Sequence, residues 1–207
     1  MTGDNNRIVE LYDNRFDEFG HDVRTVGWGS KADQILRFDM LFRDLPVKGC
    51  KILDMGCGLG DMVPYLDRIT GGDYDYVGVD VAPKLIGFAE QKFAAKHRRF
   101  ILGDIAAVDL EQCDIAVLSG ALSFRTDDNI TMAQSVIKRM HGLAKIASSL
   151  NFLSSYVDYQ TDKNFHYQPE EMFGFAKRLT RWVNLYHDYP LWEFTLQLRH
   201  QPREENN

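Results

Sequence analysis

The stretch that decides the fold is Ile52-Leu53-Asp54-Met55-Gly56-Cys57-Gly58-Leu59-Gly60, a short apolar strand that runs directly into three alternating glycines. A loop that binds a dinucleotide needs glycines at its first, third and sixth positions. Counting from Gly56, the third position is Gly58, but the sixth is Asp61. A carboxylate at the start of the following helix would repel a diphosphate, because helix N-termini favour anions only where they carry no competing charge. The loop is therefore predicted to bind a ligand that lies close to bare backbone and carries no phosphate there.

Two further acids follow the next two apolar runs. Asp80 ends the run 75–80, and Pro83 then suits the first turn of a helix. An acid at the carboxyl end of a second parallel strand can accept hydrogen bonds from ribose hydroxyls. The alternative is that Asp80 caps the following helix, and the two roles are compatible. Asp104 follows the run 100–102, and its alternative role is to close a turn.

These residues resemble the first motif of the class I S-adenosylmethionine-dependent methyltransferases, an acid, one apolar residue and then Gly-x-Gly-x-Gly. The resemblance implies that the cofactor is S-adenosylmethionine, with its methionine part over the glycine turn and its amino group facing Asp54. It also implies that Asp80 lies near the ribose and Asp104 near the adenine amino group. The predicted cofactor-binding residues are Asp54, Gly56, Cys57, Gly58, Gly60, Asp80, Val81, Asp104, Ile105, Ser119 and Trp28. The alternative is a glycine turn that serves only helix–strand packing.

From residue 50 onward, strand and helix patterns alternate, which predicts an α/β fold with a doubly wound, mainly parallel sheet. Strands are expected near 50–55, 75–80, 98–102, 113–118 and 143–150, and helices near 60–69, 83–96, 128–141 and 169–180. Two more runs, 181–186 and 192–200, flank a hairpin connection at 187–191. The resemblance, close over 50–120 and a matter of pattern as far as residue 200, implies a seven-stranded Rossmann-like sheet with an antiparallel last strand. We expect a methyltransferase core at 46–200 and a flexible tail at 201–207.

Residues 1–45 precede this core and read as a helical cap over the open edge of the sheet. Apolar residues recur at helical spacing within 7–19 and within 31–42. Between them lies Gly27-Trp28-Gly29-Ser30. The Trp28 ring either fills the core of the cap or contacts cofactor or substrate. Tyr12 is predicted to contact the substrate.

Composition narrows the class of protein. The chain has 207 residues, a net charge of −6 and a pI of about 5.5, so a nucleic-acid partner is not favoured. No apolar run approaches the roughly 20 residues of a membrane helix, and the N-terminus lacks a signal-peptide pattern. The chain has three cysteines, an odd number, so we expect no paired disulfides. No spacing of cysteines or histidines suggests a metal site. A cytoplasmic protein without a membrane partner is expected.

The loop after the fourth strand, 119–125, is predicted to meet the substrate through Ser123 and Arg125. It lacks the Asp/Asn-Pro-Pro-aromatic signature of methyltransferases that act on adenine or glutamine amino groups. Arg125 could clamp a carboxylate or phosphate, and the alternative is an ion pair with Asp127 or Asp128.

The long segment 151–168 is rich in polar and aromatic residues, so we expect it to close the pocket together with residues 1–45. Asn151 and Tyr156 are its predicted substrate contacts. His166 and His187 are the candidates for a general base, and the alternative for each is a structural histidine. His187 and Asp188 come directly after the sixth strand. Adjacent residues of an extended chain point to opposite faces, so they do not easily form a dyad unless the turn twists them.

The predicted function is transfer of a methyl group from S-adenosylmethionine to a small-molecule acceptor, with oxygen favoured over nitrogen. The alternatives are a protein or RNA methyltransferase and a non-catalytic cofactor-binding regulatory module. The sequence leaves open whether the protein is a monomer or a homodimer.

Overall fold

The computed structural model describes residues 3–203, and side chains from Asn6 onward. Part of the predicted flexible tail, 204–207, lies outside the described residues. A single seven-stranded sheet has the strand order β3-β2-β1-β4-β5-β7-β6. The strands are β1 Lys51–Met55, β2 Asp75–Asp80, β3 Arg98–Leu102, β4 Cys113–Leu118, β5 Ala144–Leu153, β6 Trp182–Tyr186 and β7 Glu193–Arg199.

Only β7 runs against its neighbours: it pairs antiparallel with β5 and with β6, while all other pairs are parallel. This confirms the predicted fold class, including the antiparallel last strand. The reversal of strand order lies between β1 and β4, where Ile52 pairs with Ile115 and Asp54 with Val117. In open α/β sheets, the crevice at such a reversal is where ligands bind.

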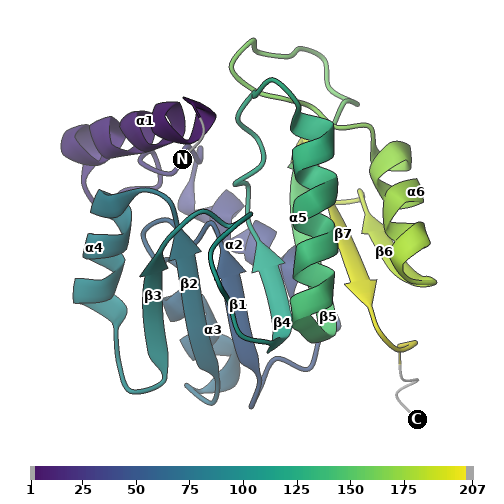
Figure 1. Cartoon of the computed structure of the whole chain (residues 1–207), viewed down its shortest axis with the longest axis horizontal. Coiled ribbons are helices and arrows are strands. Elements are labelled where there is room, and N and C mark those ends of the chain that lie inside the picture. Colours follow the sequence, from purple (N-terminus) through teal and green to yellow (C-terminus); the bar gives the residue numbers. More distant parts are fainter. Residues whose placement is uncertain (1–2, 204–207) are drawn as a thin grey trace.

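Helices cover both faces of the sheet (Figure 1). Their bounds are α1 Gly3–Phe19, α2 Lys31–Leu41, α3 Met62–Thr70, α4 Pro83–Phe93, α5 Asn129–Leu143 and α6 Pro169–Leu179. Apolar side chains of α2, α3 and α4 form one core layer with β1, β2 and β4, and those of α5 and α6 form the other. Within residues 3–203, no helix combines the length and the apolar character that crossing a membrane requires.

The two N-terminal helices have different places, although the sequence analysis assigned both to a cap. α1 lies across the carboxyl edge of the parallel strands, beside α4 (Figure 1). Its Phe16 ring packs on Phe88, and Asp17 forms an ion pair with Lys84. α2 instead packs on the face of the sheet, where Phe38 and Leu41 are buried in the core. Both helices show the same amphipathic periodicity, so the pattern alone did not separate them.

Candidate active site

The glycine loop bends sharply between β1 and α3. Gly56, Gly58 and Gly60 all have positive φ, at 84°, 53° and 76°. The backbone N–H groups of Gly56 and Cys57 both donate to the carbonyl oxygen of Val79, at 2.7 and 3.0 Å, which ties the loop to the end of β2. Glycine is required here because side chains rarely adopt this backbone region.

The three glycines face different surroundings. A Cβ atom on Gly56 would lie 2.4 Å from the Ala121 Cβ, and one on Gly58 would lie 2.9 Å from Val26 Cγ1. Gly56 and Gly58 line a cleft at the carboxyl edge of the sheet. Gly60, predicted to bind the cofactor, does not line the cleft: a Cβ there would meet Phe93, Phe100 and Ala89 within 3.3 Å. Its role in the structure is close packing of the loop against α4 and β3.

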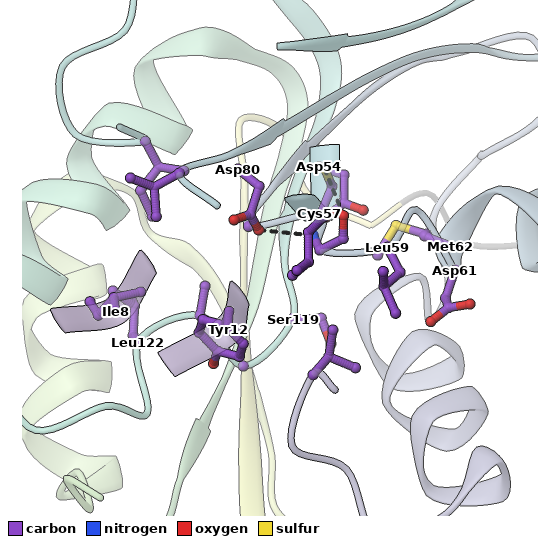
Figure 2. A pocket seen from close by; sticks show the side chains of 18 of the residues that line it. Ile8, Tyr12, Asp54, Cys57, Leu59, Asp61, Met62, Asp80, Ser119 and Leu122 are labelled. Atoms are coloured by element: carbon purple, nitrogen blue, oxygen red, sulfur yellow. Dashed lines mark hydrogen bonds between the residues drawn. The ribbon is translucent and has the colours of Figure 1, made fainter. Parts of the chain in front are cut away.

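The cleft brings together most of the predicted cofactor set, and Figure 2 shows it with Ile8 and Tyr12 of α1 across from Asp54 and Asp80. Its predicted members are Asp54, Gly56, Cys57, Gly58, Asp80, Val81, Asp104, Ile105, Ser119, Trp28 and Tyr12. The lining residues that sequence reasoning missed are mostly apolar and come from separate segments: Ile8, Val26, Gln34, Phe38, Leu59, Asp61, Met62, Leu85, Ala106, Gly120, Ala121, Leu122, Met132 and Val136.

Asp54 offers one unpaired acceptor to the cleft. Its side chain ends β1, is 2% exposed, and accepts a hydrogen bond from the Tyr76 hydroxyl on Oδ2 at 2.7 Å. Its Oδ1 atom is buried without a hydrogen-bond partner. Burial raises the pKa of Asp54 to about 7, against the lowering effect of the Tyr76 bond. A buried acceptor with no partner is costly, so this oxygen is prepared for a cationic or hydrogen-bonding group of a ligand.

Asp80 organises the loop from the adjacent strand. Its Oδ2 accepts the backbone N–H of Gly58 at 2.9 Å, and its Oδ1 accepts that of Ala82 at 3.0 Å. Burial raises the pKa of Asp80 despite these bonds. Burial and the nearby Asp80 charge also raise the pKa of the Tyr12 phenol above its usual value. Asp80 therefore supports the turn before α4 and also lines the cleft. It does not cap the helix, whose N-cap position is Ala82 without a side-chain cap, and its contact with a ribose stays a prediction.

Asp104 and Cys57 have simpler surroundings. Asp104 Oδ1 accepts the N–H of Ala106 at 2.8 Å, which closes the turn after β3, and the side chain also lines the cleft. The Cys57 thiol is buried, and burial raises its pKa well above the usual value. A neutral buried thiol packs as a small apolar group, and Cys57 also lines the cleft.

Asp61 links the glycine loop to the N-terminal segment. Its carboxylate accepts hydrogen bonds from His21 Nε2 at 2.9 Å and Gln34 Nε2 at 3.2 Å, and Lys31 Nζ lies 3.5 Å away. Burial acts to raise the pKa of Asp61, but the His21 bond, the Lys31 charge and the Gln34 bond together lower it. From the sequence, Asp61 indicated only that the loop does not bind a diphosphate. The signal in the sequence was an acidic residue at the start of a helix, directly after the glycine loop, where it can bind polar side chains of another segment.

The loop after β4 meets the cleft through residues 119–122, whereas the predicted contacts Ser123 and Arg125 do not line it. Arg125 points to the segment after β5, where its Nε and Nη2 donate to the carbonyls of Asp162 and Asn164 at 2.9 and 2.8 Å. The expected ion pair with Asp127 or Asp128 is not formed among residues 3–203. Asp128 instead caps α5 through the N–H of Thr131. Backbone carbonyls of a distant loop were the partners that local spacing did not reveal.

Asn151 and Tyr156 also lie outside the cleft lining. Asn151 is buried behind the loop after β4, where its Oδ1 accepts the N–H of Gly120 at 2.8 Å. Tyr156 is exposed, and its hydroxyl donates to Glu170. Asn151 therefore supports the wall of the cleft, whereas Tyr156 lies on the surface and bonds to Glu170.

Neither predicted histidine base is among the residues that line the cleft. The His187 ring is exposed and lies 6.0 Å from the rings of Tyr156 and Phe194. Asp188 is exposed too and faces Arg43 at 3.8 Å, so the structure forms no His187–Asp188 dyad. Burial and the Arg125 charge lower the pKa of His166, which lies on the segment that braces the loop after β4.

Comparisons with known proteins identify the family of the chain. Residues 52–143 match a family model described as a methyltransferase domain. The protein named "Putative methyltransferase Rv1506c" from Mycobacterium tuberculosis is 32% identical over 156 residues, which cover 72% of this chain and 92% of that protein. The magnesium-protoporphyrin O-methyltransferase of Rhodobacter capsulatus is 30% identical over 139 residues, covering 64% of this chain but only 60% of that enzyme.

A crystal structure shows the same fold at lower identity. The magnesium protoporphyrin IX methyltransferase of Synechocystis PCC 6803, solved with S-adenosylhomocysteine or S-adenosylmethionine bound, matches with TM-scores of 0.68 and 0.67 at 14% identity. The match to the first of these covers 95% of this chain and 99% of the Synechocystis chain. With the Mycobacterium relative matched over nearly its whole length, this chain belongs to the class I S-adenosylmethionine-dependent methyltransferase family.

Proposed function

We propose that the protein transfers the methyl group of S-adenosylmethionine to an acidic oxygen of a small-molecule acceptor. The observation that carries this proposal is the chemistry of the cleft lining. Its ionisable side chains are four aspartates, one tyrosine and one cysteine, and within residues 3–203 no histidine, lysine or arginine lines it. The cleft therefore offers negative charge for a cationic cofactor and no basic side chain for the acceptor.

The residues fit this cofactor. The unpartnered Oδ1 of Asp54 suits the ammonium group of its methionine part, and Asp80 retains lone pairs for ribose hydroxyls. Val81 and Ile105 provide apolar surface for the adenine, next to Asp104. When bound, the cofactor supplies a methyl group on a sulfonium sulfur, and this sulfur is an excellent leaving group because it departs as a neutral thioether. The remaining task of the protein is to hold the acceptor in line and to exclude water.

The lack of a basic side chain in the described cleft lining favours oxygen over nitrogen. An amine acceptor must be neutral to attack, but neighbouring carboxylates stabilise its protonated form and raise its pKa. A carboxylic acid, phenol or enol ionises in water without help from a protein base. The aspartates act against this anion, as Asp80 does in raising the pKa of the Tyr12 phenol, and the sulfonium charge offsets them. The name of the R. capsulatus relative, an O-methyltransferase, supports the same acceptor atom. The apolar residues Ile8, Leu122 and Met132 suit an apolar body on the acceptor.

Isotope transfer tests the proposal. The protein is incubated with S-adenosylmethionine carrying a ¹³C-methyl group and a panel of benzoic acids and phenols, each matched by an aniline or benzylamine of the same shape. We expect methyl esters or ethers, detected by mass spectrometry, with S-adenosylhomocysteine formed in equal amount. Across a series of phenols, the pH at which the rate levels off should follow the pKa of the phenol. At saturating S-adenosylmethionine, methylation of the amines in preference, or a rate that levels off at the same pH for every phenol, would contradict an acceptor that needs no protein base.

Tyr12 gives a smaller test of the cap. Its ring contributes cleft lining from α1, so Tyr12→Ala should weaken S-adenosylhomocysteine binding about 10-fold in titration calorimetry, in line with the area lost from an aromatic side chain. Tyr156→Ala is the matched control, because Tyr156 is exposed and outside the cleft lining. Equal effects of the two substitutions would remove α1 from the binding site.

A further inference from the structure

A buried ion pair outside the cleft lining joins α2 to β7. Arg37 of α2 and Glu193 at the start of β7 are 7% and 3% exposed. Arg37 Nε lies 2.8 and 2.9 Å from the two carboxylate oxygens of Glu193, and its Nη2 also donates to Oε1. Replacing such a pair by apolar side chains often costs no stability, so its presence in a core calls for a reason other than stability.

The pair continues to the wall of the cleft through one amide. Asn151 Nδ2 donates to Glu193 Oε2 at 2.8 Å, and Asn151 Oδ1 accepts the backbone N–H of Gly120 at 2.8 Å. Gly120 lines the cleft. Hydrogen bonds therefore run without interruption from a helix on the face of the sheet to the loop after β4.

The same arginine reaches this wall by a second route. The centre of its guanidinium lies 4.0 Å from the Trp28 ring centroid, a cation–π contact. Trp28 packs so closely on Gly120 that a Cβ atom there would lie 2.0 Å from Trp28 Cη2. Both routes end on the surface formed by Trp28 and Gly120, which we call the Trp28–Gly120 wall. The next residue, Ala121, abuts Gly56 of the glycine loop.

We propose that Arg37, Glu193 and Asn151 are positioning residues that fix the Trp28–Gly120 wall against the cofactor-binding loop. A methyl transfer in line needs its reacting groups held to within a fraction of an ångström, so a wall that shifts would lose alignment. The three residues form no part of the cleft lining and act only through Gly120 and Trp28. This inference rests on the proposed function only for the purpose of the Trp28–Gly120 wall, which is to align the methyl transfer. Its test needs neither cofactor nor acceptor.

The test uses a single-tryptophan background. The chain has three tryptophans, and Trp182 and Trp192 are exposed, so W182F/W192F leaves Trp28 as the only reporter. In this background R37M/E193L removes both charges together, which avoids leaving one buried charge unpaired. The control R98M removes another arginine that pairs with a carboxylate, Asp67, and lies over an aromatic ring, Tyr74, away from the cleft.

We expect R37M/E193L to fold, with circular dichroism like the parent, while iodide quenching of Trp28 fluorescence rises. Hydrogen exchange of the Gly120 amide should accelerate about 10-fold, because Asn151 loses the partner that orients it. R98M should change neither readout. The proposal is overturned if quenching and Gly120 exchange in the double variant equal those of the parent. It is also overturned if exchange rises equally throughout β1 and β4, because the pair would then be a general stabiliser.

Discussion

A Gly58→Val variant is expected to fold and to show no detectable binding of S-adenosylmethionine. Gly58 has a φ of 53°, which a β-branched side chain does not tolerate without strain. Its Cβ would lie 2.9 Å from Val26 Cγ1, on a surface that lines the cleft. The displaced backbone would also lose the 2.9 Å bond from the Gly58 N–H to Asp80. Both the space for the ligand and the orientation of Asp80 would be lost together.

Titration calorimetry with S-adenosylhomocysteine measures the loss, and circular dichroism checks the fold. Gly49→Val is the matched control, because Gly49 has a φ of 76° but nothing within 4 Å of its Cβ position, and it does not line the cleft. The control should share the backbone strain and keep its affinity. Global unfolding of Gly58→Val alone would mean that the loop is needed for the fold rather than for the ligand.

Local sequence patterns predicted the elements and the cofactor loop because their causes are local. The apolar run 52–55, the glycines and Asp54 determine their own backbone and strand end, and register along the sheet then places Asp80 beside Gly58. Local pattern did not reveal the surroundings of Gly60, because Phe93 and Phe100 reach it only in the folded chain. A motif identifies a conformation more surely than it identifies a contact.

The surroundings of the loop after β4 were poorly predicted because long-range packing determines them. Arg37 and Glu193 are 156 positions apart, and nothing in either neighbourhood marks the other. The segment 151–168 was expected to cover the pocket with residues 1–45, yet the structure connects it to the loop after β4. Phe165 N–H donates to the Ser123 carbonyl at 2.9 Å, and the Tyr167 hydroxyl donates to that of Leu122 at 2.9 Å. A joint closing movement of the two segments stays a prediction.

Asp54→Asn should separate stability from binding. In the ligand-free protein the buried Asp54 carboxyl has its pKa raised to about 7 from the ordinary 3.8. The native state thus retains a proton that the unfolded chain releases, so the stability gained from the neutral carboxyl is full below pH 3.8 and is lost as the pH rises to 7. Asparagine has the same shape and no charge to bury. At pH 8 the free energy of unfolding of the variant should therefore exceed that of the parent by roughly 2–4 kcal/mol, measured by denaturant unfolding. At pH 4 the difference should be small.

The same substitution should weaken S-adenosylmethionine binding about 100-fold at pH 7.5, because the ammonium group would lose an ionised, buried acceptor. In the parent protein, affinity should fall as the pH drops below 7, since binding requires Asp54 to release its proton. Calorimetry in two buffers of different ionisation enthalpy measures that release directly.

Asp39→Asn is the control for this experiment. Asp39 also accepts a tyrosine hydroxyl, that of Tyr65 at 2.9 Å, but it lies outside the cleft lining and is largely exposed. The Asp39→Asn substitution should change neither the affinity for the cofactor nor the pH dependence of stability.

A stabilised Asp54→Asn variant that still binds the cofactor normally would show that the free Oδ1 atom has no ligand partner. Loss of binding without stabilisation would instead mean that the carboxylate is ionised at little cost in the free protein. Only the combination of gained stability and lost affinity matches a buried acid held in place for the cofactor, since sites prepared for a charged ligand reduce stability in its absence.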